Sequence, residues 1–330
     1  MKRPAVGRAI RLILTVAIIV LLVMFARTVN WTRAWDAIIS ASPWLLLAAF
    51  AANLLSLVFR AIRWWVLLRA VGNVSLFRAL AATVAGAGLN NVLVAQGGEA
   101  ARVVFITRAS GIPASRVIAT AALDRLFDPI GFLVLLGWGT LAFDLPPDLQ
   151  RFRTPAIVVL VIVAVLLVWL GLSARTAAPE HVPERRATPR GWRAKVRAWL
   201  VEFGGSMREL ATGPRIIAVV LLTLGAWVAQ LATFALAADA AHVHMPLPGH
   251  LAALLATNVS LIIRATPGNV GFFQFAYALV AAEFGVRKAD AIAVSVLIQA
   301  LQIIPVTLLG IAIAPDFIFR RRKAEAPEPA

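Results

Sequence analysis

Long apolar segments, separated by basic ones, constrain this chain more than any other feature. Residues Ile216 to Ala238 contain no charged side chain, and a helix needs roughly 20 apolar residues to cross a bilayer. Only 15% of all residues are charged, against about 25% in soluble domains. We therefore predict an all-α, polytopic membrane helix bundle. Its full spans, about six in number, are 12–26, 44–59, 117–143, 155–173, 216–238 and 289–314.

The distribution of Lys and Arg predicts which side of the membrane each loop faces. Five segments hold 4, 4, 4, 9 and 4 of the 32 Lys and Arg residues, namely 1–11, 60–78, 97–126, 174–215 and 320–323. Cytoplasmic loops carry an excess of positive charge, so these segments and both termini are predicted to be cytoplasmic, at the inner membrane of a bacterial cell. The net charge of +16 belongs to these loops, and no nucleic acid is expected as a partner.

The whole chain, 1–330, is predicted to form a single transmembrane domain. Its first apolar segment is interpreted as a retained helix, because Phe25-Ala26-Arg27 is a poor cleavage site for a signal peptide. The Arg and Trp residues of 60–65 are interpreted as anchors at the membrane interface, where a basic loop begins. Three further segments are predicted: an irregular cytoplasmic linker over 174–190, an amphipathic helix over 191–211 that lies on the membrane surface or, equally, under the bundle, and a basic and then flexible tail over 315–330.

Two apolar segments are predicted to enter the membrane and return on the same side. Segment 80–95 lies between two basic loops that are both predicted to be inside, so it cannot cross once. The flanking spans are oriented so that 251–284 must also cross the membrane an even number of times, or enter it and return on the same side. Interrupted segments in both halves of a chain point to a binding site in transporter folds. The residues at or near the two interruptions include Asn90, Gly98, Pro267 and Gly268.

Ionisable side chains are concentrated around these interruptions, and such groups are expensive inside a membrane. Glu99 and Arg102 are three apart on a helix and can pair, whereas Asp124 and Asp128 share a face and need a cation between them, a role that Arg125 can fill. Arg guanidinium groups match phosphate oxygens bidentately, and N–H groups at the starts of the broken helices add positive partial charge. The candidate lipid- or substrate-binding residues are Arg63, Asn90, Gly98, Glu99, Arg102, Asp124, Arg125, Asp128, Arg264, Pro267, Gly268 and Gln274.

The same charged pairs have an equally good structural explanation, in which they cancel internally and hold helices together. No catalytic residue, metal site or cofactor is predicted. The chain has no cysteine, and no acidic cluster accompanies His242, His244 and His250 to complete a metal site. It also lacks the Gly-rich loop of an ATP motor.

The chain resembles the lysylphosphatidylglycerol-synthase transmembrane domain family, also called flippase-like integral membrane proteins. The resemblance rests on the order of four elements along nearly the whole chain: Arg60-Ala61-Ile62-Arg63-Trp64, Gly98-Glu99-Ala100-Ala101-Arg102, Asp124-Arg125-Leu126-Phe127-Asp128 and Pro267-Gly268-Asn269-Val270-Gly271. In fused members this domain moves an aminoacylated phospholipid between leaflets, and a separate soluble domain makes that lipid. The resemblance implies the transport part alone, because roughly 100–200 further residues would be needed for the second domain.

The chain departs from the family pattern at several charged positions. Gln96 stands where the family often has Arg, Asp124 and Gln274 where it often has Glu, and Gln299 where it often has Arg. These departures leave open the substrate and the coupling ion that the resemblance would imply.

The leading functional hypothesis is a translocator of a lipid between leaflets, either an anionic or modified phospholipid or a polyprenyl-linked lipid. Movement would be downhill or coupled to a gradient through Glu99 or Asp124. The alternatives are an integral membrane lipid-headgroup transferase and a secondary transporter of a small anion. Membrane lipids are the expected partners, with a lipid-synthesising or glycosyl-transferring protein as a candidate protein partner; the oligomeric state is left open.

Overall fold

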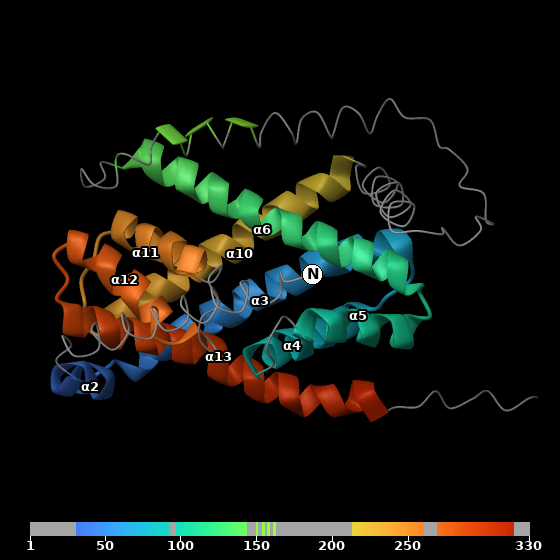
Figure 1. Ribbon diagram of the computed structural model, residues 1–330, viewed down its shortest axis with the longest axis horizontal. Coiled ribbons are helices and arrows are strands. Elements are labelled where there is room, and N and C mark those ends of the chain that lie inside the picture. The colour runs from blue at the N-terminus through green and yellow to red at the C-terminus, as the bar shows by residue number, and fades with distance from the viewer. Residues whose placement is uncertain are drawn as a thin grey trace, which may run out of the picture. The chain divides into compact units, whose positions relative to one another are not determined.

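The computed structural model describes residues 31–92, 97–143, 213–260 and 269–319, with a few positions between 150 and 162. Within these residues the chain forms helices and no strands, which confirms the all-α prediction (Figure 1). The helices are α2 (Trp31–Ile39), α3 (Pro43–Val71), α4 (Leu76–Val92), α5 (Gly97–Ser110), α6 (Ala114–Ala142), α10 (Gly213–Ala240), α11 (Leu247–Ser260), α12 (Phe272–Glu283) and α13 (Lys288–Phe319).

Some predicted segments lie outside the described residues. They are the first span 12–26, most of the span 155–173, the linker 174–190, the surface helix 191–211 and the tail from 320 onward.

Three of the described helices are long and apolar enough to cross a membrane. They are Pro43–Val71, Arg215–Ala240 and Lys288–Gly310. These helices contain the predicted spans 44–59 and 216–238 and most of the span 289–314. Helix α6 covers nearly all of the predicted span 117–143 as one continuous helix. The chain is therefore a helical, multi-pass membrane protein.

The end of the second predicted span is corrected by the structure. The sequence predicted a basic loop over 60–78, but α3 continues unbroken to Val71. Neither Gly nor Pro interrupts this stretch before Gly72, and Arg is a good helix former. The additional turns carry Arg63 and Trp64 into the interior, where both are buried. Their predicted role as anchors at the membrane interface is therefore wrong.

The described helices divide between two compact units, each assembled from separate stretches of the chain. The first unit contains α2, α11 and α12, with α3 up to Phe59, α6 from Phe127, α10 from Thr223 and α13 up to Ile303. The second unit contains α4, α5 and the remaining parts of α3, α6, α10 and α13.

The first unit is built on small and aromatic side chains. Phe234 of α10 contacts Phe273 and Tyr277 of α12, with ring centroids 6.2 and 6.1 Å apart. Gly131 of α6 lies against the indole of Trp227, because a Cβ at this position would overlap the ring. These contacts bury apolar surface. Where helices contact each other and not lipid, this burial is the main favourable contribution to the free energy of packing.

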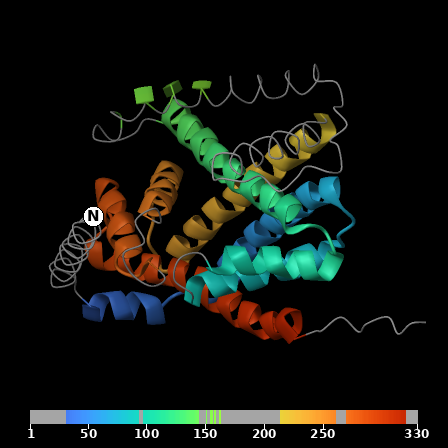
Figure 2. The ribbon, with the colours of Figure 1, turned by 45° about the vertical axis from the view of Figure 1, so that its right-hand side comes forward.

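Two helical hairpins appear where the sequence predicted interrupted segments. Helices α4 and α5 lie side by side (Figures 1 and 2) and run antiparallel. At one end Arg78 Nη1 donates to the carbonyl oxygen of Ala109 at 3.1 Å, and at the other Gly98 N donates to Asn90 Oδ1 at 2.9 Å. Helices α11 and α12 also pack against each other. The chain reverses between α4 and α5, but not as predicted: the sequence predicted the return within 80–95 and placed 97–126 in the cytoplasm, whereas Leu76–Val92 is one continuous helix and α5 forms the returning limb.

Two glycines fix α4 in the second unit. They are two residues apart, so they point to nearly opposite faces of the helix. Gly86 faces α5, where an added Cβ would lie 2.9 Å from the carbonyl oxygen of Gly98. Gly88 faces α13, where a Cβ would lie 2.8 Å from the Cα of Gly310. The α4 backbone is therefore in direct contact with a neighbour on both sides.

Candidate functional site

The site starts from an ion pair between two helices of the second unit. Arg63 of α3 donates from Nε to Oδ1 of Asp124 of α6 at 2.8 Å. The two side chains are only 1% and 5% exposed. A charge buried to this extent is costly unless it is paired and hydrogen-bonded. The pair therefore explains how α3 and α6 bury charge at this point.

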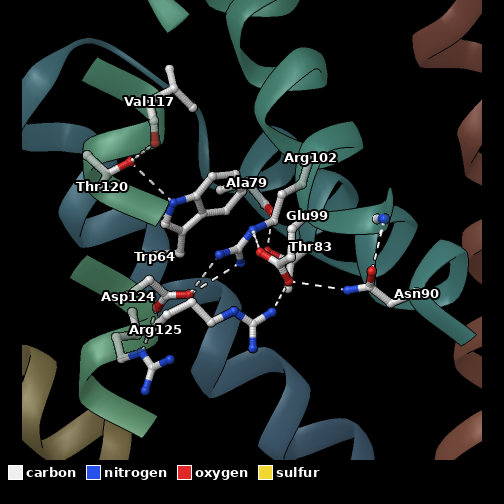
Figure 3. A network of polar contacts seen from close by, with 12 residues as sticks. Trp64, Ala79, Thr83, Asn90, Glu99, Arg102, Val117, Thr120, Asp124 and Arg125 are labelled. Carbon is white, nitrogen blue, oxygen red and sulfur yellow. Dashed lines mark hydrogen bonds and ion pairs between the residues drawn. The ribbon is translucent and has the colours of Figure 1, made fainter. Parts of the chain in front are cut away.

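Arg102 of α5 brings a second guanidinium group to the same carboxylate (Figure 3). Its Nη1 and Nη2 lie 3.3 Å from Asp124 Oδ2, and its Cζ lies 4.4 Å from the ring centroid of Trp64, within the range of a cation–π interaction. The Trp64 ring is fixed because its Nε1 donates to Thr120 Oγ1 at 3.3 Å. Asp124 is thus shared between two arginines, Arg63 and Arg102.

Glu99 joins the buried part of this network to its exposed part. Its Oε2 lies 2.8 Å from Arg102 Nε, which confirms the pair predicted from their spacing. Its Oε1 accepts hydrogen bonds from Nη2 of Arg125 and from Nδ2 of Asn90, the latter at 3.3 Å. The side chain of Arg125 is 50% exposed, against 20% for Glu99. The network therefore leads from the interior at Arg63 to the surface at Arg125.

A close contact between two helix backbones places Glu99. A Cβ at Gly98 would overlap the carbonyl oxygen of Gly86, so only glycine allows α5 to start this close to α4. The N–H of Gly98 donates to Asn90 Oδ1, and Asn90 thereby satisfies one of the free amides that every helix start leaves. The sequence predicted that amides near Gly98 would add positive partial charge to the site, but this amide is occupied by Asn90.

The ion pairs described above join three arginines to two carboxylates. The arginines are Arg63, Arg102 and Arg125, and the carboxylates are those of Glu99 and Asp124. Arg125 has the most exposed side chain of the three arginines, so it is the one that an incoming anion can reach.

Two exposed apolar side chains lie near Arg125 on α6. Ile118, one heptad earlier on α6 and therefore on the same face of that helix, is 45% exposed, and the neighbouring Leu126 is 49% exposed. A guanidinium group flanked by exposed aliphatic side chains matches a ligand that has both an anionic group and an apolar part.

The second hairpin holds an uncharged polar cluster in the first unit. Gln274 Oε1 accepts from the N–H of Gly271 at 2.6 Å, and Gln274 Nε2 donates to Gln299 Oε1 at 2.5 Å. Asn269 Nδ2 donates to Ser260 Oγ at 3.0 Å. The cluster therefore consists of amide and hydroxyl side chains, which carry no charge.

The predicted site residues thus fall into three groups. Seven belong to the network of the second unit: Arg63, Asn90, Gly98, Glu99, Arg102, Asp124 and Arg125. Gln274 and Asp128 belong to the first unit. The remaining three, Arg264, Pro267 and Gly268, lie outside the described residues. The sequence predicted Arg125 as the cation between Asp124 and Asp128; in the structure Arg125 donates to Glu99, and Arg63 and Arg102 pair with Asp124.

Sequence reasoning missed three residues that support the network. The position of Trp64 at the end of an apolar segment predicts an interface anchor, and nothing local indicates that its ring contacts Arg102. Thr120 carries no distinct signal, because Thr is common in apolar helices. Gly86 lies in a Gly- and Ala-rich segment. This composition predicts a close contact with another helix, but it does not indicate which helix.

The described residues contain no group of three or more His, Asp or Glu side chains placed to hold a metal ion.

Comparison with known proteins identifies one family. The family model described as the Lysylphosphatidylglycerol synthase TM region matches residues 12–310. No curated protein is significantly similar to the chain. Since the match covers most of the sequence, the chain belongs to this family of lipid-related membrane domains.

Proposed function

On the premise of this family membership, we propose that the protein translocates an anionic lipid between the leaflets of the bacterial inner membrane. In this proposal the headgroup phosphate binds at Arg125, which Glu99 joins to the buried network. The lipid is an anionic or modified phospholipid or a polyprenyl-linked lipid. All of these share a phosphate group and long apolar chains.

The observation that carries the proposal is that the network ends at an exposed guanidinium group, that of Arg125. Arg125 is half exposed and shares Glu99 with the buried Arg102. An arriving phosphate oxygen can replace Glu99 Oε1 at the Arg125 guanidinium, because both are anionic acceptors for the same N–H donors. Glu99 keeps its second oxygen on Arg102, so the exchange leaves no carboxylate without a partner.

The apolar surroundings of Arg125 favour a lipid over a small soluble anion. Ile118 and Leu126 are exposed on either side of Arg125 along α6, in a chain with several membrane-spanning helices. Acyl chains can cover these side chains while the phosphate binds the guanidinium group.

The proposed topology has six full spans, two re-entrant hairpins and both termini in the cytoplasm. The α4–α5 hairpin supports the first of the two reversals, and the basic segments support the orientation. The chain has no cysteine, so single introduced cysteines can be tested for labelling from either side without background. Labelling of a cysteine in 1–11 from the periplasmic side would contradict the proposed orientation.

The function is tested by leaflet exchange in proteoliposomes of the purified protein. Phosphatidylglycerol and phosphatidylcholine carry the reporter on an acyl chain, so that the headgroups are native, and exchange is measured with and without a proton gradient. We expect faster exchange of phosphatidylglycerol, lost in Arg125→Ala. The matched control is Arg116→Ala, which removes an exposed arginine from the same helix. Equal exchange in both variants would contradict the assignment of Arg125.

Two further readouts from the same vesicles separate the alternative functions. Uptake of inorganic phosphate without lipid exchange would identify a small-anion transporter. A change in the mass of the supplied lipid would identify a headgroup transferase. A lipid-synthesising or glycosyl-transferring protein is proposed as a partner, because a translocator moves a lipid that another protein must make.

A further inference from the structure

Helix α2 differs from the other described helices because its surface has three distinct faces. Successive residues of an α-helix are about 100° apart around its axis. One face is buried and made of Ala34 with the partly buried Ala37 and Ile38. A second face is exposed and apolar. A third face is exposed and polar.

An ion pair and a backbone hydrogen bond attach α2 and the loop after it to the rest of the first unit. Arg33 Nε lies 2.9 Å from Asp290 Oδ1, near the start of α13. Arg287 Nε lies 2.8 Å from the other oxygen of the same carboxylate. The loop that follows α2 is fixed as well, because Ser42 N donates to the carbonyl oxygen of Ala240 at 2.8 Å. Helix α2 is therefore held at the end of the unit where α10 ends and α13 begins (Figure 2).

The exposed apolar face consists of three large side chains at a spacing of four residues. Trp31, Trp35 and Ile39 are 57%, 62% and 67% exposed. Large apolar side chains that line up on one face and stay uncovered mark a surface that contacts another apolar phase or partner.

The exposed polar face lies next to this apolar face around the helix axis. Thr32, Asp36 and Ser40 each follow one of the three apolar residues and are exposed. A helix covered by a protein partner needs no water-facing strip beside its contact face. A helix at a membrane surface needs one face for lipid and one for water, in addition to its contact with the protein.

We propose that α2 lies along the membrane surface, with Trp31, Trp35 and Ile39 inserted at the boundary between headgroups and acyl chains. The partner of this face is the lipid surface. Trp is enriched at this depth because its ring is apolar and its N–H is polar. The face continues onto the start of α3, where Trp44 is 79% and Leu47 is 55% exposed on a helix long enough to span the membrane.

The geometry also indicates what α2 does for the protein. The ion pairs of Asp290 with Arg33 and Arg287 join α2 to the start of α13, which is itself long and apolar enough to span. A surface helix tied to the starts of two spans fixes the depth of both in the bilayer. This proposal does not depend on the identity of the transported substrate.

The test uses the absence of cysteine in the chain. Single cysteines replace Trp31, Thr32, Trp35, Asp36 and Ile39, one at a time, and carry a nitroxide spin label in proteoliposomes of phosphatidylglycerol and phosphatidylcholine. Oxygen, which concentrates in the acyl region, and a water-soluble nickel chelate report the accessibility of each label. Trp35→Cys and Asp36→Cys are the matched pair, because they are adjacent in sequence and about 100° apart on the helix.

We expect a higher ratio of oxygen to nickel accessibility at 31, 35 and 39 than at 32 and 36. A ratio that favours nickel at all five positions would place α2 in water and overturn the proposal. Labels at 31, 35 and 39 that neither reagent reaches would show that protein, such as a second copy of the chain, covers this face, and would also overturn it. The three apolar positions are tested separately, so a failure to fold in one variant leaves the others to decide.

Discussion

Replacing Asp124 by Asn tests whether the network is as closed to water as its burial indicates. The substitution keeps the shape of the side chain but removes the charge that Arg63 and Arg102 share at 2.8 and 3.3 Å. The side chains of Arg63 and Arg102 are each at least 95% buried. Removing one partner of a buried ion pair costs about 3–5 kcal/mol, because the remaining charge has lost its compensation. This cost is a large part of a typical stability of about 5–15 kcal/mol.

The assay is unfolding of the purified protein in mixed micelles with a rising fraction of denaturing detergent, followed by circular dichroism. Arg125→Ala is the matched comparison, because its ion pair with Glu99 is half exposed and exposed pairs contribute only about 0–1 kcal/mol. We expect Asp124→Asn to lower the free energy of unfolding by several times the effect of Arg125→Ala. Adding Arg63→Gln to Asp124→Asn should recover part of the loss. Equal effects of the two single substitutions would refute the claim that Asp124 sits in a closed interior.

Three further predictions concern packing, charge and pH. Gly98→Ala should separate α4 from α5 and lower the unfolding midpoint strongly. In the control Gly225→Ala, the added methyl group contacts the side chain of Phe59, which can move, so the midpoint should fall less. Equal midpoints would contradict the backbone contact at Gly98. Glu99→Gln should raise the affinity for phosphatidylglycerol in a vesicle-binding assay, because Arg125 loses its competing carboxylate; weaker binding would show that Glu99 orients Arg125 for the headgroup. Burial lowers the pKa of His250 below its usual value of 6.5, so its contribution to stability is present above that pH and is lost as the pH falls through the lowered pKa. A thermal midpoint that falls in acid for the wild type but not for His250→Gln would support this.

The sequence predicted local features of the network well and its long-range pairing poorly. The end of α5 at Ser110 follows from nearby residues, since Gly111-Ile112-Pro113 comes directly after it and neither Gly nor Pro favours a helix interior. The pairing of Glu99 with Arg102 follows from their spacing on that helix. The partner of Asp124 does not follow in this way, because Arg63 is 61 residues away in the sequence.

This missing pair also explains the wrong prediction at the end of α3. Basic residues at the end of an apolar segment are typical of a membrane interface, and Arg63 and Trp64 fit that pattern. They are buried because Asp124 neutralises one and Arg102 covers the ring of the other. A positional rule cannot anticipate a counter-charge from a distant helix. The same limit applies to Gly86, whose role depends on Gly98 of the next helix.

The lipid that the protein retains through purification tests the central claim most directly. Native mass spectrometry would compare bound phosphatidylglycerol and phosphatidylcholine in the wild type, Arg125→Ala and Arg116→Ala, after mixing with equal amounts of both lipids. We predict preferential retention of phosphatidylglycerol by the wild type and by Arg116→Ala, and loss of this preference in Arg125→Ala. The same preference in all three proteins would contradict a headgroup site at Arg125.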